Sequence, residues 1–136
     1  RVILEWLDLE AGGGRILPAD RAARFAALRL QALADGIADA ALLIVYEGRL
    51  RAETERSANW LAHQQGKIDR GLDALEAAPP PAEAPLCVGT IALACALGYL
   101  DLRLAGRWRD AHPKLVAWLD AFAARVPSFE KTRFVP

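Results

Sequence analysis

The sequence VGTIALACALGYLDLRL, residues 88–104, is the most informative part of this chain. A helix over these residues would be apolar on nearly every side until Asp101 and Arg103. Such a helix is normally surrounded by other helices. The uncharged run from Leu86 to Leu100 is also shorter than the roughly 20 residues that a bilayer span needs. We therefore expect residues 88–104 to form the central helix of a helical bundle and not a transmembrane helix.

The length and composition of the chain are those of one globular domain. It has 136 residues, of which 54% are hydrophobic and 25% are charged, and compact domains usually contain roughly 100–200 residues. Val, Ile and Thr are scarce relative to Ala and Leu, which favours helix over strand. Lys and Arg together number 17, as do Asp and Glu, so the chain lacks the positive charge that phosphate contacts require. The prediction is an all-α domain that binds neither nucleic acid nor membrane.

Further helices are predicted on both sides of the central one. The longest pattern runs from about Asp20 to Arg51, and another runs from Thr54 to Ala77. Residues 79–85 are predicted as a loop because their prolines remove backbone donors and block helix continuation. The last long helix is expected to begin near Pro113. Its packed face is expected to consist of Leu115, Trp118, Leu119 and Phe122. Trp108 and Trp118 are expected to anchor the core.

Two faces of the helix predicted over residues 20–51 carry different side chains. The first has the spacing of an apolar core stripe and consists of Leu30, Leu33, Ile37, Ala41 and Ile44. The second mixes apolar and charged groups at the same spacing and consists of Leu28, Ala32, Asp35, Asp39, Leu42, Tyr46 and Arg49. A mixed face is typical of an interface or the wall of a site, and the alternative is a solvated face with helical charge pairs. The two carboxylates would repel each other unless a cation lies between them.

The cysteines and histidines do not form a recognisable reactive or metal-binding pattern. Cys87 and Cys95 would lie about 12 Å apart along one helix, too far for a disulfide. His63 and His112 belong to no spacing typical of metal ligands. We expect both histidines to be structural and no metal to be bound.

Four strings, in order along the chain, are similar to the C-terminal helical domain of the glutathione S-transferase family, particularly its bacterial members. The first resembles the last helix of the family's thioredoxin-like domain, and the other three resemble the first long helix, the central helix and the ending of its helical domain. The strings are RVILEWLD (1–8), ADGIADA (34–40), IALACALGYLD (91–101) and HPKLVAW (112–118), which PSF (127–129) and Thr132 follow. The resemblance covers almost the whole chain and implies an all-α bundle of that type.

The resemblance also implies a division of the chain. Residues 1–11 would be the last helix of a thioredoxin-like domain, residues 12–18 a linker, and residues 19–136 the C-terminal helical domain. Arg1 opens directly into an apolar pattern without a cap, so we expect a fragment that begins inside a helix. The family's thioredoxin-like domain binds glutathione and activates its thiol, so no catalytic residue is expected in this chain. Cys87 and Cys95 are not substitutes, because an apolar setting keeps a thiol protonated.

Several site residues are implied in the same way. Asp39 matches a family carboxylate that reaches across the dimer to the γ-glutamyl ammonium of the neighbour's glutathione. Leu42, Tyr46 and Arg49 continue that face and would line the pocket for the electrophile.

The predicted central helix departs from the family at its start. The family usually has a Ser/Thr-x-x-Asp capping box there, and the corresponding residues of this chain are Cys87 and Thr90. A thiol is a weak acceptor and Thr90 has no carboxylate, so two backbone amides would lose their usual partners. Thr90 is an alternative cap, which would start the helix later.

The leading hypothesis is the electrophile-pocket and dimerisation domain of a glutathione S-transferase. Its intact form would be a cytoplasmic homodimer that conjugates glutathione, as a substrate, to small apolar electrophiles. The alternative is a transferase-like module that binds or assembles without catalysis. A third interpretation, the ligand-binding half of an all-α regulator, fits the helix content but not the four strings.

Overall fold

The computed structural model describes residues 1–134, and within that range the chain is helical and contains no strand. The elements are α1 (Val2–Glu10), α2 (Arg21–Leu50), the short 3-10 helix η1 (Glu53–Glu55), α3 (Ala58–Ala77), α4 (Val88–Leu104), α5 (Pro113–Arg125) and α6 (Pro127–Lys131). The prediction of an all-α fold is confirmed. Residues 135–136, the end of the predicted helical domain, lie outside the described residues.

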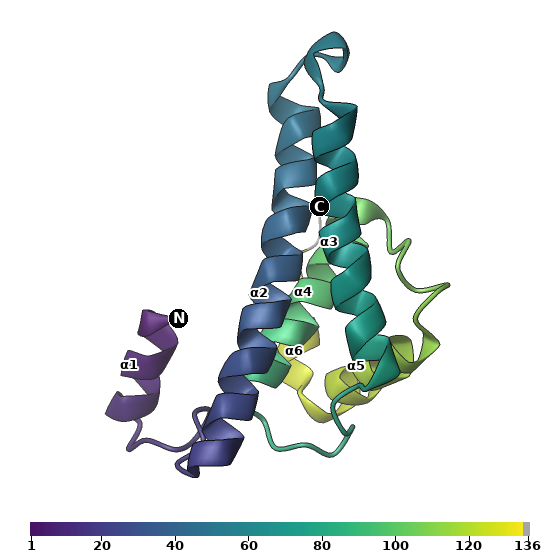
Figure 1. The fold of residues 1–136 in the computed structure, drawn as a ribbon. Helices are drawn as coiled ribbons and strands as arrows, with labels where there is room; N and C mark the ends of the chain where they lie inside the picture. The colour runs from purple at the N-terminus through teal and green to yellow at the C-terminus, as the bar shows by residue number, and fades with distance from the viewer. Residues whose placement is uncertain (135–136) are drawn as a thin grey trace.

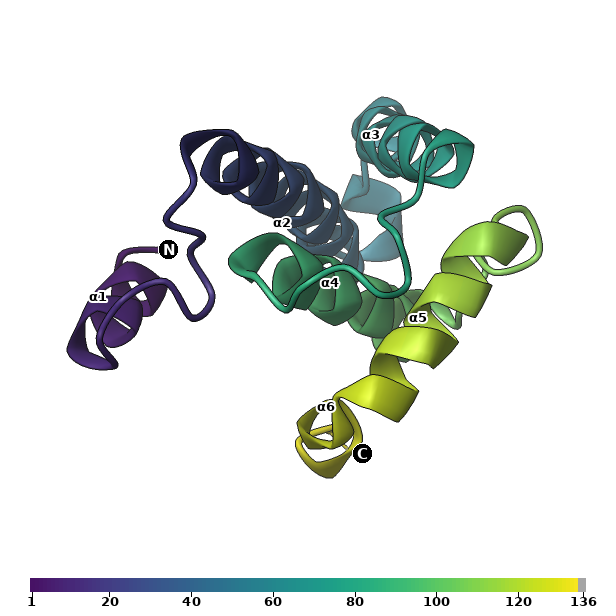
Figure 2. The ribbon, with the colours of Figure 1, turned by 90° about the horizontal axis from the view of Figure 1, so that it is seen from below.

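Helix α4 lies in the middle of the bundle, with α2 and α3 on one side and α5 on another (Figures 1 and 2). Its bounds are those predicted from the sequence. Five of its side chains, each no more than 2% exposed, belong to one core cluster and are Leu93, Ala94, Ala96, Leu97 and Leu100. The same cluster contains the predicted anchors Trp108 and Trp118.

The prediction that α4 is enclosed on all sides is wrong for one face. Cys95 and Leu102 are exposed there, because no element among residues 1–134 packs over them.

Helix α4 starts at Val88, so the alternative of a later start at Thr90 is wrong. Cys87 occupies the N-cap position, and its backbone N–H donates to the Thr90 hydroxyl over 3.0 Å. The Thr90 hydroxyl also lies 3.0 Å from the carbonyl oxygen and 3.7 Å from the sulfur of Cys87. A hydroxyl therefore supplies the contact that the family's carboxylate would make to the N-cap amide.

Two glycines allow α2 to lie unusually close to its neighbours. A Cβ atom on Gly89 of α4 would lie 2.6 Å from the carbonyl oxygen of Ala27 and 2.9 Å from the Cβ of Leu30. A Cβ atom on Gly71 of α3 would lie 2.8 Å from Cγ1 of Ile37. Both helices therefore pack against α2 through positions that have no room for a side chain.

The predicted core face of α2 is largely confirmed. Ile37 and Ala41 are buried, and Leu30 and Ile44 are partly buried against the core cluster. Leu33 departs from the prediction, since it is 37% exposed and lines a shallow groove between α2 and α3.

Helix α3 starts four residues later than the sequence pattern predicted. Ser57 is the N-cap, and its hydroxyl accepts the N–H of Trp60 over 3.2 Å. The preceding residues form η1 instead, so the helical pattern that begins at Thr54 does not belong to one continuous helix.

Helix α1 runs beside the first half of α2 in the opposite direction (Figure 1). Two ion pairs join them, Arg1 with Asp35 at 2.7 Å and Glu5 with Arg24 at 3.6 Å. The segment between the two helices turns through three glycines, at residues 12–14, that all have positive φ.

The buried carboxylate of Asp8 holds this turn. It accepts the backbone N–H groups of Ile16 at 2.8 Å and of Gly14 and Arg15 at 2.9 Å. These bonds, led by the one from Ile16, hold the pKa of Asp8 below its usual range. The turn is therefore attached to the end of α1 by backbone hydrogen bonds that favour the ionised form of this carboxylate.

Carboxylates of α3 hold the start of α5. Glu76 accepts the N–H groups of Lys114 and Leu115, each at 3.0 Å, and so caps a helix other than its own. One turn earlier, Asp73 lies 3.2 Å from Nε2 of His112. The prediction that α5 begins near Pro113 is confirmed, and His112 is buried at its N-cap.

Within residues 1–134, no helix combines the length and the apolar character that crossing a membrane requires.

The contact at Gly89 predicts the outcome of two glycine substitutions in α4. Gly89→Ala should destabilise the domain by about 1–3 kcal/mol, because the new methyl group meets a backbone carbonyl that cannot move alone. Gly98→Ala is the matched control, since its Cβ would lie 3.4 Å from Phe129, an ordinary contact. It should stabilise by up to about 1 kcal/mol through helix propensity. Urea unfolding measures both, and equal stabilities would contradict the close approach of α4 and α2.

The lowered pKa of Asp8 predicts a pH-dependent contribution to stability. The contribution is fully present above the unfolded pKa of about 3.9 and is lost as the pH falls through the lower folded value. Asp8→Asn should therefore be less stable than wild type near pH 6 and approach it below about pH 4. Urea midpoints across this range measure the difference, with Asp110→Asn on an exposed loop as control. A constant difference at all pH values would contradict the role of the ionised carboxylate.

Candidate functional site

The predicted site residues of α2 lie along one side of the helix. Asp39, Leu42, Tyr46 and Arg49 follow one another at three- and four-residue intervals, which keeps them on a common face. All four are exposed, Leu42 to 36% and Tyr46 to 46%. The structure thus brings them together as a surface, here called the α2 face.

The two carboxylates of this helix have different surroundings. Asp35 is paired with Arg1, which directly precedes α1 and supplies a cation beside it. Asp39, one turn later, makes no ion pair or side-chain hydrogen bond with any residue that the structure describes. Asp39 therefore has an unpaired charge that a cationic group from outside these residues can reach.

The α2 face extends beyond α1. The N-terminus of α1 reaches the level of Asp35, and the second half of α2 rises above it in Figure 1. Leu42 and Tyr46 therefore present apolar surface beside the charged groups of Asp39 and Arg49. The face is open, and its role as the wall of an electrophile pocket stays a prediction.

A separate hollow of about 440 Å³ lies between the exposed face of α4 and the C-terminal segment. It is lined by Cys95, Gly98, Tyr99, Asp101, Leu102, Phe129, Thr132, Arg133 and Phe134. Sequence reasoning missed this hollow because it treated α4 as enclosed. The signal was present in the spacing of Cys95, Tyr99 and Leu102, which share one face of the helix.

The Asp101 carboxylate holds the rim of this hollow. It accepts the indole N–H of Trp108 at 2.9 Å and forms a two-point contact with Arg109, at 2.9 Å from Nε and 2.6 Å from the terminal nitrogen. Hydrogen bonding to Asp101 raises the pKa of Arg109. The charges of Asp101 and Arg109 are therefore paired with each other. Besides Asp101, the charged side chain that lines the hollow is that of Arg133.

The thiol in this hollow is not an activated nucleophile. Cys95 is exposed at the surface of the hollow, but the protein atoms around its sulfur exclude part of the solvent. This desolvation raises the pKa of the Cys95 thiol above its usual value, which favours the protonated form at neutral pH. The direction of this shift agrees with the expectation for Cys95. Any thiol chemistry at the hollow therefore requires a thiolate from another source.

Comparison with known proteins identifies the relatives of this chain. Residues 58–121 match the family described as glutathione S-transferase, C-terminal domain. The chain is 35% identical over 135 residues to YibF of Escherichia coli K12, an uncharacterised GST-like protein, covering 96% of this chain and 66% of YibF.

Solved structures show the same relationship. A glutathione transferase family member from Pseudomonas fluorescens Pf-5, crystallised with S-(propanoic acid)-glutathione, is 43% identical with a TM-score of 0.92, over 100% of this chain and 70% of that one. A glutathione S-transferase from Methylobacterium radiotolerans, in complex with glutathione sulfonate, is 36% identical with a TM-score of 0.86, over 99% of this chain and 65% of that one. The fold, the family match and the identity along the full chain agree, and this chain belongs to the glutathione S-transferase family.

Proposed function

We propose that this chain is the electrophile-pocket and dimerisation domain of a glutathione transferase that conjugates glutathione to small apolar electrophiles. The observation that carries the proposal is the match to the Pseudomonas fluorescens protein, which extends over this entire chain and whose crystal contains a glutathione conjugate. The chain spans 66% of the length of YibF. In this proposal residues 1–11 close a thioredoxin-like domain, residues 12–18 link it, and residues 19–136 form the helical domain.

The α2 face supports a division of labour between glutathione and electrophile. Asp39 offers an ionised acceptor for the γ-glutamyl ammonium, and a charge-assisted hydrogen bond of that kind is stronger than a neutral one. Leu42 and Tyr46 offer apolar surface that gains by burial against an apolar electrophile. Arg49 adds a cation at the far end of the same face. Such a surface discriminates among apolar electrophiles only weakly.

The proposal includes a homodimer, because Asp39 would serve the glutathione of the neighbouring subunit. The exposed apolar side chains on the second half of α2 support an association of this kind. They are Leu42, Leu43, Tyr46 and Leu50. A cytoplasmic location is proposed because glutathione and free cysteines such as Cys87 and Cys95 belong to a reducing compartment.

The alternative is a transferase-like binding module without catalysis. The proposal places the thiol-activating residue in the thioredoxin-like domain, so the groups described above are compatible with both functions. The two functions share glutathione binding and differ in turnover.

A chimera tests the proposed function. This chain would replace the matching 70% of the Pseudomonas fluorescens protein, which leaves that protein's remaining residues in place. The chimera should bind glutathione in calorimetry and conjugate it to a chlorodinitrobenzene. The 136-residue chain alone should show no turnover above the buffer rate, because catalysis needs an activated nucleophile. Glutathione binding without turnover in the chimera would favour the binding module, and turnover by the chain alone would overturn the division of labour.

Asp39→Asn in the chimera tests the glutathione contact. It should weaken glutathione binding by about 1–3 kcal/mol, the scale for one hydrogen bond to a charged group. Asp69→Asn on the exposed side of α3 is the matched control and should leave the affinity unchanged. Tyr46→Ala should instead raise the KM for the electrophile. Equal glutathione affinities in wild type and Asp39→Asn would leave Asp39 without a ligand role.

A further inference from the structure

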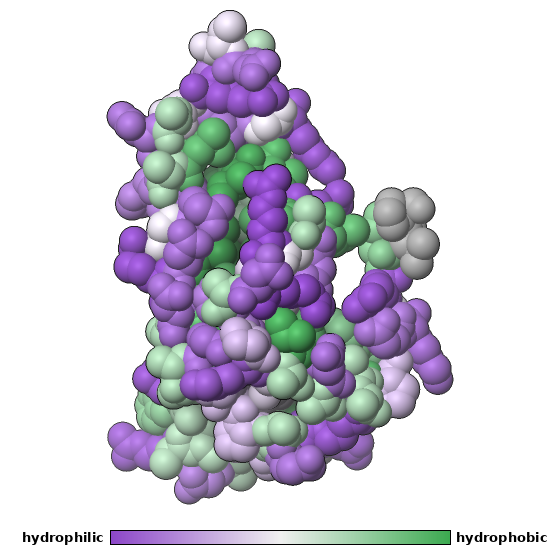
Figure 3. Space-filling model, turned by 90° about the vertical axis from the view of Figure 1, so that its right-hand side faces the viewer, coloured by the Kyte–Doolittle hydropathy of each residue, from purple (hydrophilic) through white to green (hydrophobic). Residues whose placement is uncertain are grey.

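The end of the α2–α3 hairpin, residues 46–60, is here called the tip. Between Leu42 and His63 the one buried side chain is a charged one, Glu47, which is 8% exposed. Figure 3 shows polar side chains over the tip and apolar side chains gathered below it. Apolar burial, which holds the rest of α2 and α3, therefore does not hold the tip.

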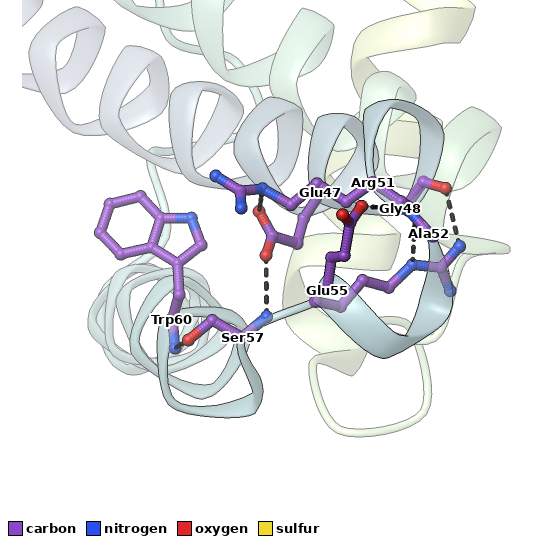
Figure 4. A network of polar contacts seen from close by, with 8 residues as sticks. Glu47, Gly48, Arg51, Ala52, Glu55, Ser57 and Trp60 are labelled. Carbon is purple, nitrogen blue, oxygen red and sulfur yellow. Dashed lines mark hydrogen bonds and ion pairs between the residues drawn. The ribbon is translucent and has the colours of Figure 1, made fainter.

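Glu47 joins the two helices of the hairpin (Figure 4). One carboxylate oxygen accepts the backbone N–H of Ser57 at 2.9 Å, and the other lies 3.2 Å from Nε of Arg51. Ser57 is also the N-cap of α3, so this contact ties the end of α2 to the residue that caps the next helix.

Arg56 closes the end of α2 from the other side. Its terminal nitrogen donates to the carbonyl oxygen of Gly48 at 2.9 Å, and its Nε donates to that of Arg51 at 3.4 Å. The last carbonyl groups of a helix lack partners within the helix, and a guanidinium satisfies them while favouring the negative end of the helix dipole. Arg56 is thus a C-terminal cap supplied from beyond the helix.

The capped turn carries two residues of the α2 face. Tyr46 directly precedes Glu47, and Arg49 directly follows Gly48, so each is next to a residue that the network holds. Fraying of this turn would change the direction of both side chains without disturbing α4, which packs against the earlier part of α2.

We infer that Arg56 and Glu47 are positioning residues, which keep the last turn of α2 helical and so hold Tyr46 and Arg49 in place for the electrophile. The claim that Tyr46 and Arg49 are held for the electrophile rests on the proposed function. The claim that Arg56 and Glu47 keep the last turn of α2 helical concerns this chain alone. Neither residue needs to touch the ligand, because both act through the backbone of α2.

The first experiment measures the order of the tip in the 136-residue chain. Amide hydrogen exchange would compare wild type, Arg56→Gln, Arg56→Lys and the control Arg29→Gln, an exposed α2 residue far from the tip. Arg56→Gln should speed exchange at Tyr46 and Arg49, in the turn that Arg56 caps, by about 5- to 30-fold, the factor for losing a net hydrogen bond or two. Amides of α4 should stay within about twofold of wild type, because the loss is local. Arg56→Lys should be intermediate, since lysine keeps the charge but not the two-point contact.

The second experiment measures the consequence for the ligand in the chimera. Arg56→Gln should raise the KM for the chlorodinitrobenzene by about fivefold or more while the glutathione affinity stays at the wild-type value. Arg29→Gln should change neither quantity. A general loss of stability would lower both kinds of binding, so this separation distinguishes positioning from a structural role.

The outcomes of these two experiments can be distinguished from a failure of the proposed function. Unchanged exchange at Tyr46 and Arg49 in Arg56→Gln would overturn the inference, as would faster exchange with an unchanged electrophile KM. A wild-type chimera that binds no glutathione would count against the proposed function, and the exchange data would still decide whether Arg56 and Glu47 hold the tip. Where Arg56→Gln gives no folded protein, Glu47→Gln provides the same comparison with an uncharged group at the buried position.

Discussion

The close contact between α4 and α2 at Gly89 is the constraint on which the rest of this structure depends. With no side chain at Gly89, the backbone of α4 closely approaches the Ala27 carbonyl of α2. This close approach lets side chains of the two helices pack together in one core cluster. Gly71 repeats the arrangement between α3 and α2. Because α3 and α4 are both held this close, the first half of α2 has a fixed direction. That direction sets where the α2 face lies on the domain.

Carboxylates hold the connections that apolar packing does not reach. Asp8 holds the turn after α1, Glu76 caps α5, Asp101 holds the segment after α4, and Glu47 holds the tip. Each accepts N–H groups that its surroundings leave without partners, and such groups are costly when buried and unpaired. The domain therefore combines buried apolar clusters in its interior with carboxylate hydrogen bonds at its edges, where the candidate ligand surfaces lie.

The sequence could predict which residues share the candidate face of α2, but not where that face ends or which of its charges are paired. Helical spacing put Asp39, Leu42 and Tyr46 on one face, and they do share it. The ion pair of Asp35 with Arg1 joins residues 34 positions apart, so no local pattern could separate the paired carboxylate from the unpaired one. The hollow beside Cys95 was missed because an apolar helix has the same sequence whether a neighbour covers it or not.

The sequence by itself determined the helices and the family, because apolar periodicity, caps and proline positions act within a few residues of one another. The bounds of α4 and the start of α5 follow from such local terms. Only the tertiary structure decided that Leu33 is exposed and that Arg56 closes α2. Those features depend on distances between segments that the packing of α2, α3 and α4 sets, and no local preference contains that information.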